Sequence, residues 1–291
     1  MNVLLLHPGA MGASIGAALV AGGHATAWIA QGRSAETAKR AADAGLSRVE
    51  TLAAGVDGAE LVISVCPPHA SVDVARAVHD AGFTGLYVDG NAVSPATAEA
   101  VHRLFGERYV DGGIIGPPAW RAGATRFYLS GSHAQTVAAL FEGSLVDARA
   151  IGTAPTQASA LKMSYAAFTK GSSALLLAVR ALAQANGVSQ ELLAEWDISQ
   201  PGLASRSAGT AKSTSQKAWR FEGEMREIAA TFAAAELPSG FHEGAAELYA
   251  RMAALKDVPG GAGIEVVLAE ILDHSPAASG SKARRALWEW R

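Results

Sequence analysis

Short apolar runs alternate with helix-like stretches through about residue 150, which predicts a doubly wound, mostly parallel sheet. The run 3–6, Val-Leu-Leu-Leu, has the length and apolarity of a strand that is buried on both faces. Further strands are expected at 61–65, 86–88, 109–110 and 127–129, and helices at 70–81 and 96–105. The N-terminal part is therefore predicted to have an α/β fold.

Strand signals nearly vanish after Pro155, and the rest of the chain is rich in Ala, Leu and Glu, with breaks at Gly and Pro. A long helix is expected from about 156 to 186. Since 291 residues exceed what one compact core usually holds, two domains are expected. We predict an α/β domain over 1–153 and an all-helical domain over 154–291.

A glycine turn follows the first predicted strand. The segment Gly9-Ala10-Met11-Gly12 lies between that strand and a helix of small and apolar residues, as in a dinucleotide-binding (Rossmann) site. Glycine lets the backbone approach the phosphates, and the new helix favours an anion at its N-terminus. The usual G-x-G-x-x-G pattern would place its first glycine at position 7, which is His7; Pro8 is another way to shape the turn. A tight turn without a ligand is the alternative.

The end of the second predicted strand favours NADP(H) over NAD(H). Sites for NAD carry a carboxylate here for the ribose 2′-hydroxyl, but this segment contains Gln31, Arg33 and Ser34, and no acid before Glu36. A guanidinium and a hydroxyl suit a 2′-phosphate. The alternative is that Arg33 is a solvated loop charge.

The composition limits the kinds of partner that the protein is expected to bind. The chain is 49% hydrophobic and 18% charged, and its formal net charge of −3 gives no reason to expect nucleic acid or an anionic membrane. The most lipid-like stretch, 175–182, is short and interrupted by Arg180. A single cysteine, Cys66, excludes an internal disulfide framework and fits a reducing cytoplasm. The eight histidines lack metal-ligand spacing, so no metal is expected.

Lys162 is the first candidate for chemistry in the long helix. Between Pro155 and Val179 the only charged residues are Lys162 and Lys170. Desolvation in an apolar helix disfavours the charged amine and lowers its pKa towards that of a proton donor. Helical spacing places Lys162 near Ser159, Tyr165, Ala166 and Thr169. A lysine that reaches solvent or a distant acid is the alternative.

Together these residues resemble the β-hydroxyacid dehydrogenase superfamily, which includes hydroxyisobutyrate and 6-phosphogluconate dehydrogenases and the related imine reductases. The residues that carry the resemblance, in chain order, are Gly9-Ala10-Met11-Gly12, Ser64-Val65-Cys66-Pro67, 88–95 around Asn91, 111–117 around Ile115 and Gly116, and Lys162. The resemblance implies that Val65, Cys66 and Pro67 pass beneath the cofactor, with Asn91 nearby. It also implies that Lys162 exchanges the proton while hydride moves between nicotinamide and a substrate carbon.

Departures from the family pattern predict an unusual substrate. Asn91 and Ile115 stand where serines occur, and Ala166 replaces an asparagine. Ile115, Gly116, Tyr165, Ala166 and Thr169 then line a larger and more apolar pocket. Asn91 and Tyr165 are candidates to orient the substrate; an Asx turn and core packing are the respective alternatives. The family's later Lys-Asp pair falls on Gly223 and Glu224, so Glu224 is expected to hold Lys162 or close the site.

The favoured function is an NADP(H)-dependent oxidoreductase that acts on a small molecule and pairs as a homodimer through its helical domain, as the resemblance implies. One alternative is imine reductase-like reduction of a C=N bond, although imine reductases usually carry Asp or Tyr at the position of Lys162. Another is an NADPH-binding sensor without turnover. Trp288 and Trp290 are expected to dock on a helical surface or a partner subunit.

Overall fold

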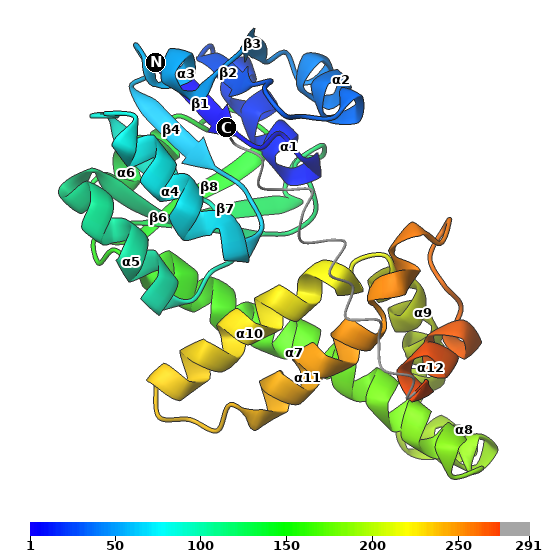
Figure 1. Ribbon diagram of the computed structural model, residues 1–291. Coiled ribbons are helices and arrows are strands. Elements are labelled where there is room, and N and C mark those ends of the chain that lie inside the picture. Colours follow the sequence, from blue (N-terminus) through cyan, green and yellow to red (C-terminus); the bar gives the residue numbers. More distant parts are fainter. Residues whose placement is uncertain (274–291) are drawn as a thin grey trace. The chain divides into compact units, whose positions relative to one another are not determined.

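The computed structural model describes residues 1–273 and confirms the α/β fold class. One eight-stranded sheet has the order β3-β2-β1-β4-β5-β6-β7-β8 (Figure 1). The strands are β1 Asn2–Leu6, β2 Ala25–Ile29, β3 Ser47–Val49, β4 Leu61–Ser64, β5 Leu86–Asp89, β6 Tyr109–Ile115, β7 Thr125–Ser130 and β8 Val146–Gly152. All neighbours are parallel except β6 and β7. The order of the first six strands is that of a dinucleotide-binding fold.

Helices cover both faces of this sheet. Apolar clusters place α1 Ala10–Ala21, α2 Ala35–Asp43 and α6 Ala134–Ala139 on one face. On the other face lie α3 Leu52–Val56, α4 Ser71–Asp80 and α5 Pro95–Phe105. Because helices cover both faces of the parallel strands, the side chains on both faces are apolar and the strands form continuous apolar runs, as the sequence pattern predicts.

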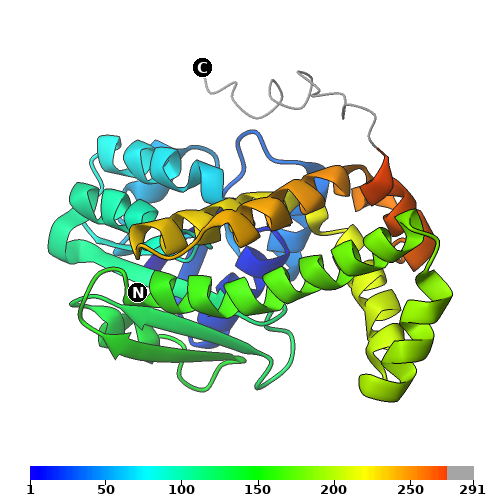
Figure 2. The same cartoon turned by 90° about the horizontal axis from the view of Figure 1, so that it is seen from below.

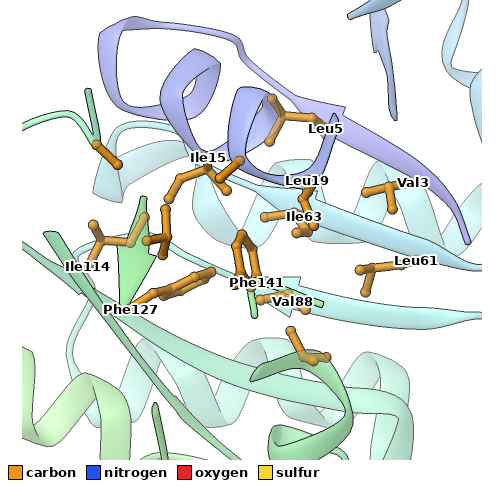
Figure 3. Packing of buried hydrophobic residues seen from close by; sticks show 14 of the residues in the cluster. Val3, Leu5, Ile15, Leu19, Leu61, Ile63, Val88, Ile114, Phe127 and Phe141 are labelled. Atoms are coloured by element: carbon orange, nitrogen blue, oxygen red, sulfur yellow. The ribbon is translucent and has the colours of Figure 1, made fainter. Parts of the chain in front are cut away.

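The packing of α1 on the sheet sets the position of the glycine turn. Leu5 and Ile15 are fully buried and belong to the same apolar cluster as Phe127 and Phe141, whose ring centroids are 5.7 Å apart (Figure 3). A Cβ on Gly16 would lie 2.9 Å from Leu5 and 2.7 Å from Leu46. Burial of each large apolar side chain contributes roughly 1.5–3 kcal/mol. The N-terminus of α1 is therefore held close to the end of β1.

Two strands escape the sequence pattern, and both β6 and β7 are longer than predicted. Strand β3 has only three residues, of which Ser47 and Arg48 are exposed, so it carries no hydrophobic signal. Strand β8 alternates polar residues with small apolar ones at the edge of the sheet. Strand β6 continues through Gly112 and Gly113, which have no room for a Cβ beside Phe127 and Ala158 respectively.

The long helix predicted over about 156–186 corresponds to α7 Gln157–Ala185. The chain forms two compact units: Met1–Ala167 with Glu227–Ser239, and Phe168–Arg226 with the residues from Gly240 on. This division lies within α7 and differs from the boundary near residue 153 that the sequence predicts, because the first turns of α7 are anchored on the sheet.

The second unit is helical throughout the part that the structure describes, as predicted (Figure 2). It contains the C-terminal part of α7, the first part of α10 and four whole helices. The helices after α7 are α8 Ser189–Ser199, α9 Leu203–Ser215, α10 Ala218–Ala234, α11 Gly240–Arg251 and α12 Ile264–Leu272. Trp288 and Trp290 lie outside the described residues.

Within residues 1–273, α7 is the one helix that has the length and hydropathy of a membrane span, and 44% of its most apolar window is buried inside the protein. Its Arg180 is 6% exposed and donates a hydrogen bond to Ser207 of α9 at 2.7 Å. The Tyr249 hydroxyl of α11 donates to the Lys170 carbonyl of α7 at 2.8 Å. Helix α7 thus packs as a core helix of the second unit.

Candidate functional site at the carboxyl edge of the sheet

The turn after β1 brings a backbone carbonyl against the start of α1. His7 has a φ of 65°, in the left-handed region that glycine normally occupies, and its carbonyl accepts a hydrogen bond from Gly9 N at 2.7 Å. A Cβ on Gly12 would lie 2.5 Å from that carbonyl oxygen, so position 12 requires glycine. The turn therefore keeps the shape of the fingerprint even though its first glycine is a histidine.

The N-terminus of α1 is open to an anion. Gly9 caps the helix without a side-chain hydrogen bond, and the first turn contains no acidic residue. The first N–H groups of a helix have no partner within the helix, and the helix dipole adds a positive charge there. Gly9 and Ala10 are exposed, and Met11 is half-buried.

Two buried nitrogens lie at this edge without a protein partner. His7 Nδ1 and Arg33 Nε are both shielded from solvent, and neither has a hydrogen-bond partner within residues 1–273. Burial, and secondarily the charge of Arg33, lower the pKa of His7 to about 3, so its imidazole is neutral at physiological pH. Arg33 follows β2 and is half-buried, which differs from the solvated loop charge considered above.

The other two residues of the predicted 2′-phosphate site, Ser34 and Gln31, differ in their contacts. The Ser34 hydroxyl caps α2 by accepting a hydrogen bond from Thr37 N at 3.2 Å. Gln31 is exposed. A capping hydroxyl retains a hydrogen to donate to a phosphate, so the cap does not exclude Ser34 from binding.

A buried polar network joins the ends of β4 and β5. Asn91 is 2% exposed; its Oδ1 accepts from Cys66 N at 2.5 Å and its Nδ2 donates to Ser64 Oγ at 3.2 Å. The carboxylate of Asp89 accepts from Asn91 N at 2.9 Å and from Ser71 Oγ at 2.6 Å. The side chain of Asn91 therefore holds the Val65-Cys66-Pro67 segment, and the Asx turn at this position is formed by Asp89.

Cys66 is half-buried after the end of β4. Burial, followed by the charge of Asp89, raises the pKa of its thiol to about 12. A thiol with this pKa is not a nucleophile at neutral pH. Among the described residues, no group of three His, Cys, Asp or Glu side chains could hold a metal ion.

Lys162 lies against the end of β6. Its Nζ donates a hydrogen bond to the Ile114 carbonyl at 2.6 Å, and its side chain is partly exposed. The neighbouring Ile115 is 4% exposed, and Gly116 follows the strand with a φ of 124°. The amine of the predicted catalytic lysine is thus placed at the strand end that the sequence expects to line the substrate site.

The other predicted substrate residues differ in exposure. Tyr165 is 47% exposed on α7, whereas Ala166 is fully buried. Thr169 lies in the second unit, where it is half-buried. Glu224 of α10 forms an ion pair with Lys170 at 2.8 Å, and both side chains are 13% exposed. The expected contact of Glu224 with Lys162 stays a prediction.

Sequence reasoning missed the residues that anchor α7. The carboxylate of Asp111 in β6 accepts hydrogen bonds from Ser159 N at 2.7 Å and from Ser159 Oγ at 2.5 Å. In β7, Ser130 Oγ accepts from Ala158 N at 3.0 Å. The 111–117 motif contains this aspartate, but the resemblance that the motif carries predicts only a substrate site.

Sequence comparisons find a family model and a related protein. The family described as "Domain of unknown function (DUF1932)" matches residues 183–252. An uncharacterized 28.5 kDa protein of Methanothermus fervidus is 33% identical over 164 residues. That match covers 56% of this chain and 63% of the relative, so the chain spans less than two thirds of the relative's length.

Solved structures cover nearly the whole chain. 3-Hydroxyisobutyrate dehydrogenase of Mycobacterium tuberculosis, solved with L-serine, has a TM-score of 0.68 at 18% identity over 93% of this chain and 99% of its own. A reductive aminase of Aspergillus terreus, solved with NADPH, cyclohexanone and allyl amine, has a TM-score of 0.51 at 18% identity over 92% and 98%. The fold is thus that of these dehydrogenases and reductases, as the resemblance in sequence predicts.

Proposed function

We propose that this chain is an NADP(H)-dependent oxidoreductase that transfers hydride between the nicotinamide and a carbonyl or hydroxyl carbon. The observation that carries the proposal is the edge formed by the turn after β1. There, a glycine is obligatory at position 12 and two side-chain nitrogens, in His7 and Arg33, are buried without a partner in the part of the chain that the structure describes. Buried polar groups are normally satisfied, so their position favours a ligand rich in acceptor oxygens.

The residues present suit a dinucleotide phosphorylated on its ribose. The N–H groups at the start of α1, in the Gly9–Gly12 segment, would hold the pyrophosphate, and Gly12 lets the turn close against the His7 carbonyl. Arg33, with Ser34 beside it, would pair with the 2′-phosphate, and Gln31 would border it. Val65, Cys66 and Pro67, held by Asn91, would lie beneath the cofactor. When bound, the nicotinamide supplies or accepts the hydride.

In this proposal Lys162 donates a proton to the carbonyl oxygen during reduction and takes it back during oxidation. Its hydrogen bond to the Ile114 carbonyl directs the amine to the end of β6. A donor fixed by such a bond is oriented before the substrate arrives. The substrate is larger and more apolar than small 3-hydroxy acids, because Ile115 and Ala166 present no polar atom of their side chains to a carboxylate.

Imine reduction is the second candidate, and the reductive aminase among the structural neighbours supports it. Both candidates predict oxidation of NADPH. The test is to incubate the protein with NADPH and panels of carbonyl compounds and cyclic imines, and to repeat the panels with Lys162→Ala. The matched control is Lys39→Ala, because the Lys39 side chain is 75% exposed on α2 and far from the chemistry in this proposal.

The outcomes separate the candidates. Turnover of carbonyl compounds that falls by about 10²-fold or more in Lys162→Ala and is unchanged in Lys39→Ala supports the favoured function. Turnover of cyclic imines alone supports the second. Tight binding of NADPH without any turnover supports an NADPH sensor, and failure to bind any nicotinamide nucleotide refutes all three.

We further propose a homodimer formed through α7. Phe168, Leu175 and Leu182 are 73%, 51% and 64% exposed, and their seven-residue spacing places them on one side of the helix. Large apolar side chains in such a row favour burial by another helix. A second copy of α7 provides the same row, as the two-fold pairing implied by the resemblance requires. A cytoplasmic location completes the proposal and is supported by the single free cysteine.

A further inference from the structure

We propose that Asp111 is a positioning residue for Lys162: it anchors the first turn of α7 on the sheet and thereby fixes where the amine points. The inference rests on the proposed role of Lys162 in proton transfer. It concerns a residue that would touch neither cofactor nor substrate.

The anchor consists of hydrogen bonds to the start of α7. Asp111 is fully buried, and each of its carboxylate oxygens accepts a bond from Ser159, one from the N–H and one from the hydroxyl. Ser130 adds a third point by accepting from Ala158 N and donating to Asp111 Oδ2 at 3.4 Å. The N–H groups of Ala158 and Ser159 belong to the first turn, so without these acceptors they would be buried and unpaired.

Lys162 lies one turn beyond the anchor and returns to the same strand. Asp111 and Ile114 both belong to β6, so the acceptor of the helix start and the acceptor of the amine share one rigid element. Between them, a Cβ on Gly113 would lie 2.7 Å from the Ala158 carbonyl and 3.1 Å from Lys162 Cβ. The helix therefore rests directly on the strand, and small movements of the first turn displace the lysine.

Burial, and secondarily the charge of Asp89, raise the pKa of Asp111 to about 7, so the carboxyl is only partly ionised at neutral pH. An ionised Asp111 at the N-terminus of α7 complements the positive end of the helix dipole. The groups that face it are Asp89, Tyr109, Ser130 and Ser159, none of which is a cation. Within residues 1–273 its carboxylate accepts from the Ser159 N–H and from the hydroxyls of Ser159 and Ser130, which makes helix placement its main interaction.

The test measures the chemical reactivity of the Lys162 amine, in the absence of nucleotide and substrate. Wild type, Asp111→Ala, Asp111→Asn and Ser159→Ala are labelled by reductive methylation, and labelling is quantified by mass spectrometry. Lys39 serves as the exposed internal reference. The thermal midpoint of each variant is measured, and labelling is done at a temperature where all variants are folded.

Asp111→Ala is expected to increase labelling of Lys162 by about ten-fold, because a charge-assisted hydrogen bond of the amine is loosened. Ser159→Ala removes one of the two donors and is expected to give about a three-fold increase. Asp111→Asn can accept from Ser159 N and donate to Ser159 Oγ, so labelling stays within about two-fold of wild type. Rescue by this isosteric side chain is the result that a positioning role requires.

Unchanged Lys162 labelling in both alanine variants overturns the inference, even if the thermal midpoint of Asp111→Ala falls, since that result shows a purely structural aspartate. If Asp111→Ala does not fold, Ser159→Ala alone decides in the same way. Because the labelling needs no turnover, failure of the proposed enzymatic function leaves this result readable. Conversely, an active enzyme with unchanged labelling refutes only the role of Asp111.

Discussion

Replacement of His7 by glycine tests the idea that the turn after β1 sacrifices stability for ligand binding. In the protein His7 has a φ of 65° and a buried Nδ1 without a partner among the described residues. The left-handed conformation costs a non-glycine residue roughly 1–2 kcal/mol, and a buried unpaired polar atom costs about 1–3 kcal/mol. Glycine removes both costs. Against this, the unfolded chain with glycine has greater conformational freedom, which offsets about 0.4–1 kcal/mol of the gain in stability.

The free energy of unfolding of His7→Gly should therefore rise by about 1 kcal/mol or more, after allowance for the apolar contacts of the lost ring. Urea unfolding monitored by circular dichroism measures this difference. Affinity for NADPH and for NADH should each fall by about ten-fold, because one hydrogen-bonding nitrogen beside the pyrophosphate-binding turn is lost. Calorimetric titrations with both nucleotides measure the binding.

The control is Arg33→Ala, which should weaken NADPH binding with a smaller gain in stability, since it removes a buried unpaired nitrogen but relieves no positive φ. A His7→Gly protein that is less stable than wild type and binds NADPH equally well would refute the reasoning. In that case the imidazole would be a packing residue, and the turn would not be strained for function.

Three other predictions concern buried groups and the helical unit. Burial raises the pKa of Asp111 to about 7, so its contribution to stability is complete below about pH 4 and is lost as pH rises through 7. The loss amounts to a few kcal/mol at most. It should be absent when the unfolding free energy of Asp111→Asn is measured between about pH 4 and 8. Iodoacetamide at pH 8 should alkylate Cys66 at least about a hundred-fold more slowly than a small thiol, as followed by mass spectrometry; rapid alkylation would contradict its raised pKa. Leu175→Asp should convert the dimer to a monomer, as measured by sedimentation at micromolar concentration. The exposed control Lys39→Asp should remain a dimer. A monomeric wild type would exclude the proposed dimer.

The sequence contains strong local signals for the sheet and for the long helix. Buried parallel strands such as β1 and β4 are continuous apolar runs, and α7 has few charges over many turns. Such patterns single out Lys162 as a lysine in an apolar helix and Gly12 as a glycine of the turn. The short edge strand β3 and the alternating strand β8 could not be found in this way, because most of their side chains face solvent or a single helix.

The site depends on contacts that no local pattern contains. Asp111 and Ser159 are 48 residues apart, and Glu227 of α10 accepts hydrogen bonds from Ser94 N at 2.7 Å and Thr97 Oγ1 at 2.9 Å from 133 and 130 residues away. The sequence also shows Lys170 without a local acid, yet the fold supplies Glu224. Pairs of this kind form only when separate elements pack together.

The amino-acid sequence by itself determined the alternation of strands and helices, the glycine turn and the presence of a lysine in an apolar helix, since each depends on neighbours within a few residues. Only the tertiary structure decided that His7 adopts a left-handed conformation beside Arg33 and that β6 holds both the start of α7 and the Lys162 amine. The reason is physical: periodicity reports which face of an element is buried, whereas the partner on that face is selected by packing between elements that are distant in the chain.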